Sequence, residues 1–218
     1  MNNRIIIALT LLILLTTITS QDEITFTKFN LKKIIIENNS LIPEKEIREL
    51  LAPIYNKNLI FLSNLEIEKI LIKNSYIESF YIKKRYPDSL EIKIVEKKPI
   101  AILFFNKKKF YISEKIELID FKKIKEYENL PYIFGNKDEF KVFFNELKKI
   151  NFPISLIKKF ILFETNRWDL ETFDNKVIKL PTENYIKSLE NYLKLIDKDI
   201  FKKYKLFDYR ISNQLILK

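Results

Sequence analysis

Apolar and charged residues alternate within residues 80–101, and this pattern limits the possible folds of the chain more than any other segment does. Leu90, Ile92 and Ile94 alternate with charged residues, which is the period of a β-strand with one buried face. A second strand-like run precedes them, and Pro87 followed by an aspartate supplies a tight turn between the two. The segment therefore predicts a β-hairpin.

The residues before the hairpin supply the rest of a small module. A β-branched run around Ile34 predicts a strand, and Pro43 suits the first position of a helix. Ser63 with Glu66 three residues later forms the capping box of a second helix. This order predicts a small α+β module with two helices on one face of a three-stranded sheet. Pro99 withholds a ladder donor after the last strand, so we predict a domain boundary there.

An uncharged apolar run at residues 5–20 follows Arg4 and indicates export from the cytoplasm. As a helix it would span about 24 Å, a little less than the hydrocarbon core of a bilayer. We predict an uncleaved transmembrane anchor at residues 5–21 behind a cytoplasmic tail at residues 1–4. The alternative is a cleaved signal peptide, with threonine and serine near residues 17–20 at its cleavage site. Both interpretations place the bulk of the chain outside the cytoplasm.

Missing residue types exclude most catalytic chemistry. The chain has no cysteine and no histidine, so it can build no disulfide, no Ser-His-Asp triad and hardly any zinc site. Gly135 is the single glycine, which excludes glycine-rich phosphate-binding loops. We therefore expect no enzyme, no cofactor, no metal and no small-molecule substrate, and only a carboxylate-dependent hydrolase stays open. Keeping one glycine indicates a backbone position that needs a positive φ.

The net charge of the chain is +10, from 39 Lys and Arg against 29 Asp and Glu. Such a charge attracts phosphate or an anionic membrane surface. The lysines, however, are spread evenly along the sequence and form no stripe, so we expect no nucleic-acid partner.

The second half of the chain predicts a mainly antiparallel β domain with flanking helices. Strand-like runs at residues 100–105 and 110–119 come first, and an Asp-Asn turn at residues 174–175 joins two more strands. Apolar residues at helical spacing, including Phe140 and Leu189, predict two helices between and after these strands.

Several short motifs in this order resemble the FtsQ/DivIB family of bacterial cell-division proteins. The hairpin contains the family's basic residue, proline and leucine, and "VEKKPIA" at residues 95–101 matches its "E-x-x-P-I-A". "LPYIFG" resembles its Leu-Pro-x-x-x-Gly signature, and an Arg-Trp pair and an Asp-x-Arg follow. The turn at residues 112–117 departs from the family pattern because it lacks glycine. The matching positions are Arg85, Pro87, Ser89, Leu90, Glu96, Pro99, Ile100, Ala101, Gly135, Arg167, Trp168, Asp208 and Arg210.

The resemblance implies a single N-terminal transmembrane helix, a POTRA domain at residues 24–96 and an FtsQ-type β domain at residues 97–218. It also implies a non-enzymatic, bitopic inner-membrane scaffold at the division septum, with its N-terminus cytoplasmic and its bulk periplasmic. Expected partners are FtsB-like and FtsL-like proteins and other divisome membrane proteins. The alternative is another POTRA-containing envelope assembly or export factor.

Arg167 and Arg210 are the candidate partner contacts that the resemblance implies. In a lysine-rich chain, arginine at these positions suits planar, two-pronged pairing with a partner carboxylate. The alternative is an internal salt bridge, for Arg210 with Asp208 or Asp169.

The last strand of the chain is the candidate edge for strand addition. The resemblance implies that a partner binds there, and an edge strand presents unpaired backbone groups that an added strand can satisfy. Trp168 is predicted to be a core residue, with an aromatic anchor in the interface as the alternative. We predict the following partner-binding residues, with Tyr209 as an aromatic anchor beside the arginines: Arg167, Tyr209, Arg210, Gln214, Leu215, Ile216 and Leu217.

Overall fold

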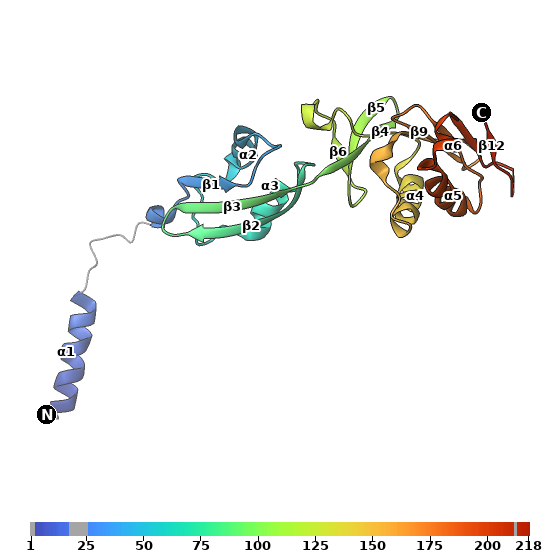
Figure 1. Cartoon of the computed structure of the whole chain (residues 1–218). Helices are drawn as coiled ribbons and strands as arrows, with labels where there is room; N and C mark the ends of the chain where they lie inside the picture. The colour runs from blue at the N-terminus through green and yellow to red at the C-terminus, as the bar shows by residue number, and fades with distance from the viewer. Residues whose placement is uncertain (1–2, 18–25, 212) are drawn as a thin grey trace. The chain divides into compact units, whose positions relative to one another are not determined.

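A computed structural model describes residues 3–17, 26–211 and 213–218 of the chain (Figure 1). The chain divides into two compact units. The first contains Met1–Lys73 and Ser79–Val95, and the second contains Asn74–Glu78 and Glu96–Lys218. Both units combine helices with β-sheet, so the fold is α+β as predicted.

The N-terminal helix α1 (Asn3–Thr17) is apolar and 15 residues long. Within the described parts of the chain, no helix has the length and apolar character needed to cross a membrane. The transmembrane part of the predicted fold class is therefore wrong. The last residues of the predicted anchor, much of the alternative cleavage site and the first two residues of the predicted tail lie outside the described residues.

The first unit has the predicted order of strand, two helices and hairpin. Its sheet has the order β1-β3-β2, in which β1 runs parallel to β3. Ile34, Leu90 and Ile92 are fully buried in this sheet, as the alternation of the hairpin predicted. The elements are η1 (Phe26–Phe29), β1 (Lys33–Glu37), α2 (Glu44–Leu50), η2 (Ala52–Ile54), α3 (Asn64–Leu71), β2 (Ile77–Arg85) and β3 (Ser89–Glu96).

Helix α3 begins at its predicted cap but lacks the predicted capping box. The Ser63 side chain accepts a hydrogen bond from the Leu65 backbone N–H at 3.2 Å. The Glu66 carboxylate instead forms an ion pair with Lys57. The hydroxyl cap alone satisfies one of the free N–H groups of the first turn.

The second unit is built on a nine-stranded sheet with the order β12-β11-β10-β9-β8-β7-β4-β5-β6. The pairs β4–β7, β7–β8 and β10–β11 are parallel, and the other described pairs are antiparallel. The elements are β4 (Pro99–Phe105), β5 (Lys108–Ser113), β6 (Leu118–Asp120), η3 (Lys125–Tyr127), β7 (Tyr132–Phe134), α4 (Lys137–Lys149), η4 (Ile154–Leu156), β8 (Ile157–Leu162), β9 (Trp168–Thr172), β10 (Val177–Lys179), α5 (Tyr185–Ile196), α6 (Asp199–Lys202), β11 (Leu206–Asp208) and β12 (Ile216–Leu217).

Helices α4 and α5 cover one face of this sheet (Figure 1). Phe143 of α4 and Tyr192 of α5 are buried in one cluster with alternate residues of the strands, such as Leu103 and Phe160. Trp168 lies in this cluster, stacked on Phe143 with ring centroids 4.9 Å apart, which confirms its predicted core role. The intervening strand residues face the opposite side, which we call the outer face.

Gly135 has no positive φ, so the reason predicted for this glycine is wrong. A Cβ atom at this position would lie 2.9 Å from the Cβ of Leu162 on β8. The glycine is therefore needed for close approach of two strands. Asparagines take most of the positive-φ positions instead, and the glycine-free turn at residues 112–117 places Ile116 at φ 60°.

Candidate partner-binding site

Strand β12 forms one end of the nine-stranded sheet. It pairs antiparallel with β11, with Ile216 opposite Asp208 and Leu217 opposite Phe207. Lys218 exchanges two backbone hydrogen bonds with Leu206, at 3.0 and 3.2 Å. In an antiparallel ladder, residues that bond to the neighbouring strand alternate with residues that do not. The N–H and C=O of Leu217 therefore point away from β11, where no described strand lies.

The predicted terminal strand at residues 214–218 is shorter in the structure. Only Ile216 and Leu217 have strand geometry, and Gln214 lies in the turn before them, with its N–H bonded to the carbonyl of Ile211. Leu215 and Leu217 pack against the core, whereas Ile216 is exposed on the outer face. The described edge strand is therefore only two residues long.

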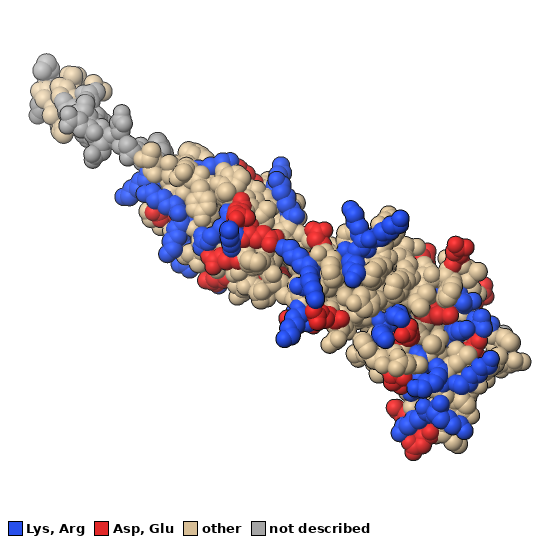
Figure 2. Space-filling view, turned by 90° about the horizontal axis from the view of Figure 1, so that it is seen from above, with Lys and Arg blue, Asp and Glu red and all other residues tan. Residues whose placement is uncertain are grey.

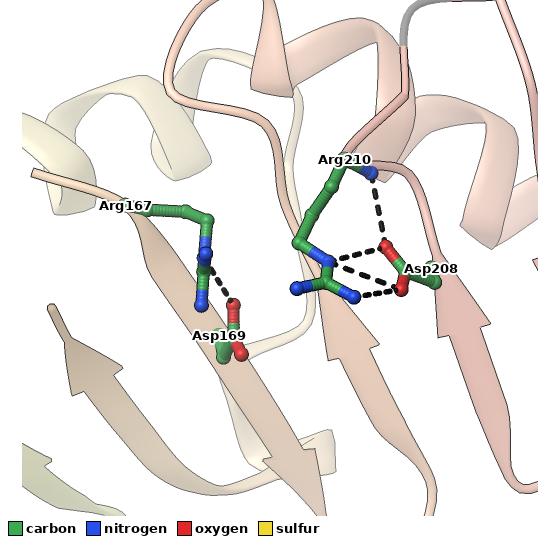
Figure 3. A network of polar contacts seen from close by, with 4 residues as sticks. All are labelled: Arg167, Asp169, Asp208 and Arg210. Carbon is green, nitrogen blue, oxygen red and sulfur yellow. Dashed lines mark hydrogen bonds and ion pairs between the residues drawn. The ribbon is translucent and has the colours of Figure 1, made fainter. Parts of the chain in front are cut away.

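Arg210 follows β11 and pairs with Asp208 (Figure 3). Its Nε donates to both carboxylate oxygens at 2.9 and 3.0 Å, and its Nη2 donates to Oδ2 at 2.6 Å. The Arg210 backbone N–H also donates to Asp208 at 3.1 Å. The side chain is still 43% exposed, so the internal salt bridge orients the guanidinium without burying it.

Arg167 precedes β9 and pairs with Asp169, through Nε to Oδ1 at 3.1 Å. Its guanidinium carbon lies 4.4 Å from the centre of the Phe163 ring, which is a cation–π contact. Figure 3 shows Arg167 and Arg210 over the same face of the sheet. Both arginines therefore form the internal salt bridges that the sequence left as an alternative, and both remain on one surface.

The two aspartates lie in one row across the outer face, with Lys179 between them. Lys179 on β10 is opposite Asp169 on β9 and Asp208 on β11. Hydrogen bonds from Arg210 hold the pKa of the Asp208 carboxyl below its usual value, and the same contact raises the pKa of Arg210. Burial raises the pKa of Asp169, although Arg167 opposes that shift. The row is nearly neutral and presents guanidinium N–H groups next to buried carboxylates.

Tyr209 lies on the other side of the sheet from the two arginines. It is largely buried in the core cluster, and its hydroxyl donates to the Asn191 side chain of α5 at 3.0 Å. Burial raises the pKa of this hydroxyl. Tyr209 also lines a cleft of about 580 Å³ between α5 and residues 209–211 and 213–215, with Lys187, Asn191 and Gln214.

Comparison with known proteins identifies the relatives of this chain. A family profile described as "POTRA domain, FtsQ-type" matches residues 29–97. The protein named "Cell division protein FtsQ" of Rickettsia bellii (strain RML369-C) is 30% identical over 190 residues, which cover 85% of this chain and 71% of that protein. The chain belongs to the FtsQ family. FtsQ of Rickettsia typhi (strain ATCC VR-144 / Wilmington) is 28% identical over 191 residues, with the same coverage, and FtsQ of Rhizobium meliloti (strain 1021) is 21% identical over 172 residues, which cover 78% of this chain and 56% of that protein.

Membership of the FtsQ family gives the chain a role in cell division, as predicted. The FtsQ-type POTRA match covers the module that the hairpin identified. Among residues 3–17, 26–211 and 213–218, no cluster of three or more acidic side chains could hold a metal ion. Figure 2 shows positive and negative side chains interspersed on the visible face of both units, without a continuous basic stripe.

Sequence reasoning named Arg167 and Arg210 as candidate site residues but missed the side chains that lie next to them. Lys179 between the aspartates and Phe163 beneath Arg167 were not predicted. Alternation along β9 and β10 assigns their residues to faces, but the register between strands decides which side chains become neighbours.

Proposed function

We propose that this FtsQ-family protein is a non-catalytic scaffold of the division septum that joins FtsB-like and FtsL-like proteins, linking early and late division proteins, by adding a partner strand to β12. The observation that carries the proposal is the open β12 edge beside the Arg210 guanidinium, with the Arg167 guanidinium farther along the same face of the sheet. We also propose that the two units act outside the cytoplasm, with other division proteins of the membrane as further partners.

Strand addition follows from the backbone at this edge. The outward N–H and C=O of Leu217 are directional groups that a partner strand can pair with. A two-residue strand offers few such bonds, so backbone pairing alone makes a weak complex. Side chains on the face of the sheet that leads to this edge therefore have to contribute both affinity and specificity.

Arg210 and Arg167 supply that contribution. Asp208 binds the Nε and Nη2 of Arg210, and Nη1 has no hydrogen bond to the described residues. A partner carboxylate can pair with that group while Asp208 keeps the guanidinium oriented. The alternative of another POTRA-bearing assembly or export factor loses support, because the matching relatives are named cell division proteins.

The test is co-purification of the full chain with FtsB-like and FtsL-like proteins from the same cell. We expect Arg210→Glu to weaken the complex at least tenfold, because it places two carboxylates together at the edge. Arg48→Glu is the matched control, since Arg48 is also an exposed arginine paired with a carboxylate of its own chain, Glu44. Unchanged binding by the Arg167→Glu, Arg210→Glu double variant would refute the proposed site.

A further inference from the structure

The outer face carries exposed aromatic side chains next to the arginines. Phe134 on β7 is 37% exposed and Phe163 after β8 is 41% exposed. Phe104 on β4 and Ile161 on β8 lie on the same face and are half-buried. We call Phe104, Phe134, Ile161 and Phe163 the outer aromatic patch.

The register makes this patch continuous with the proposed site. Phe104 lies opposite Phe134, and Phe134 lies opposite Ile161. Ile161 is opposite Asp169, which starts the charged row of Asp169, Lys179 and Asp208 that ends beside Ile216. One line of neighbouring side chains thus runs from the patch to the open β12 edge.

Contacts between the rings hold the patch in a defined arrangement. Phe104 stacks on Phe134 with centroids 5.1 Å apart and an interplanar angle of 12°, and it lies 5.6 Å from Tyr132. Phe163 supports the guanidinium of Arg167. The apolar patch and the charged row therefore meet at Arg167.

Exposed rings held in a fixed arrangement are stabilised when a partner covers them and removes their apolar surface from water. Contiguous exposed apolar surface beside polar residues marks interaction sites, and buried aromatic anchors provide much of the binding energy at interfaces. The neighbouring arginines define the chemistry of the occupant, because a segment that follows this line has to carry an acidic group beside its apolar groups.

We propose that the outer aromatic patch binds an amphipathic segment of the same partner that adds its strand to β12. This inference rests on the proposed function. The segment places apolar side chains on Phe134 and Phe163 and a carboxylate against Arg167. Neighbouring strands are about 4.8 Å apart, so β7 lies about 10 Å from β9, and the apolar anchor and the carboxylate of the partner are separated by that distance.

The first experiment measures partner binding to full-length variants. We expect the Phe134→Ser, Phe163→Ser double variant to weaken the complex at least tenfold. Phe173→Ser is the matched control, because Phe173 is 47% exposed in the same unit but lies outside the patch, and it should leave binding unchanged. Far-ultraviolet circular dichroism and thermal melting establish that each variant is folded.

The second experiment places a photo-crosslinking amino acid at position 134 of the otherwise unchanged chain. A crosslink to the partner supports the inference, also if the serine variants do not fold. Crosslinks only to a second copy of the chain, only to lipid, or to nothing overturn it. If Arg210→Glu weakens the complex but the patch variants and the crosslink show no effect, this inference fails and the proposed function stands. If the unchanged chain binds no FtsB-like or FtsL-like protein, both fail.

Discussion

The two edges of the nine-stranded sheet differ in whether outward backbone groups of the edge strand are hydrogen-bonded. At the β6 edge, the Asp120 N–H donates to the Ser75 hydroxyl at 3.0 Å, and the Asp120 carbonyl accepts from the Tyr76 hydroxyl at 2.8 Å. At the β12 edge, the outward backbone groups of Leu217 face no described strand. Free edges invite pairing with other chains, so a protein usually blocks them. The β6 edge is thus closed at Asp120, whereas the β12 edge is open at Leu217, and this difference is what the proposed strand addition at β12 requires.

We expect a proline substitution at each sheet edge to give the largest difference in partner binding between the two edges. Leu217→Pro removes an N–H that points outward, so it removes a bond to an added strand and none to β11. We expect partner binding to weaken at least tenfold, measured by co-purification and by titration of the purified complex. Leu118→Pro is the matched change on β6 and should leave binding unchanged. Equal losses at both edges would contradict the comparison.

Opening the closed edge should cost stability and leave partner binding intact. The Ser75→Ala, Tyr76→Phe double variant removes the two hydroxyls that satisfy Asp120. These hydroxyls make three hydrogen bonds with Asp120, because the Ser75 hydroxyl also donates to its carboxylate at 2.9 Å. We expect a loss of about 3 kcal/mol in the free energy of unfolding in urea, since each such hydrogen bond contributes about 1 kcal/mol. The opened edge should also self-associate, which sedimentation velocity can detect. If the variant stays monomeric and keeps its stability, these hydroxyls do not prevent pairing at the β6 edge.

The Asp208–Arg210 pair next to the open edge makes the free energy of unfolding depend on pH. The folded pKa of Asp208 lies below its unfolded value, so its stabilising contribution is present above about pH 4 and is lost as the pH falls through the folded pKa. We expect Asp208→Asn to lower the free energy of unfolding by about 1 to 2 kcal/mol at pH 7, with the difference from the unchanged protein shrinking below pH 4. A difference independent of pH would contradict this account.

The contribution of Asp169 to the free energy of unfolding should change with pH in the opposite direction. Burial raises its folded pKa, so the ionised carboxylate is destabilising above that pKa and the penalty is relieved as the pH falls through it. We therefore expect Asp169→Asn to change the free energy of unfolding at pH 7 by less than about 1 kcal/mol, because relief of the burial penalty offsets the lost pairing with Arg167. Urea titrations of both asparagine variants at the same pH values make the comparison.

Local patterns predicted the elements of the fold well. Alternation in the hairpin correctly assigned Leu90 and Ile92 to the core, and Ser63 correctly began a helix. The transmembrane span was wrong because composition alone does not set helix length: α1 is 15 residues long, and no helix of the described residues is long and apolar enough to cross a membrane. The positive φ of Gly135 was wrong because its constraint comes from Leu162, a residue of another strand. Contacts between distant segments leave no periodic signal in a sequence.

The sequence by itself determined the order of strands and helices, the family and the presence of arginine at positions 167 and 210. These follow from side-chain period, from capping and turn residues and from short motifs, all of which act within a few residues. Only the tertiary structure decided that Arg167 and Arg210 share one face, that Lys179 separates their aspartates and that Asp120 on one edge strand is hydrogen-bonded on its outward side while Leu217 on the other faces no described strand. The physical reason is register: pairing between strands far apart in the chain selects the neighbours of each side chain, and a shift by one residue would move them to opposite faces.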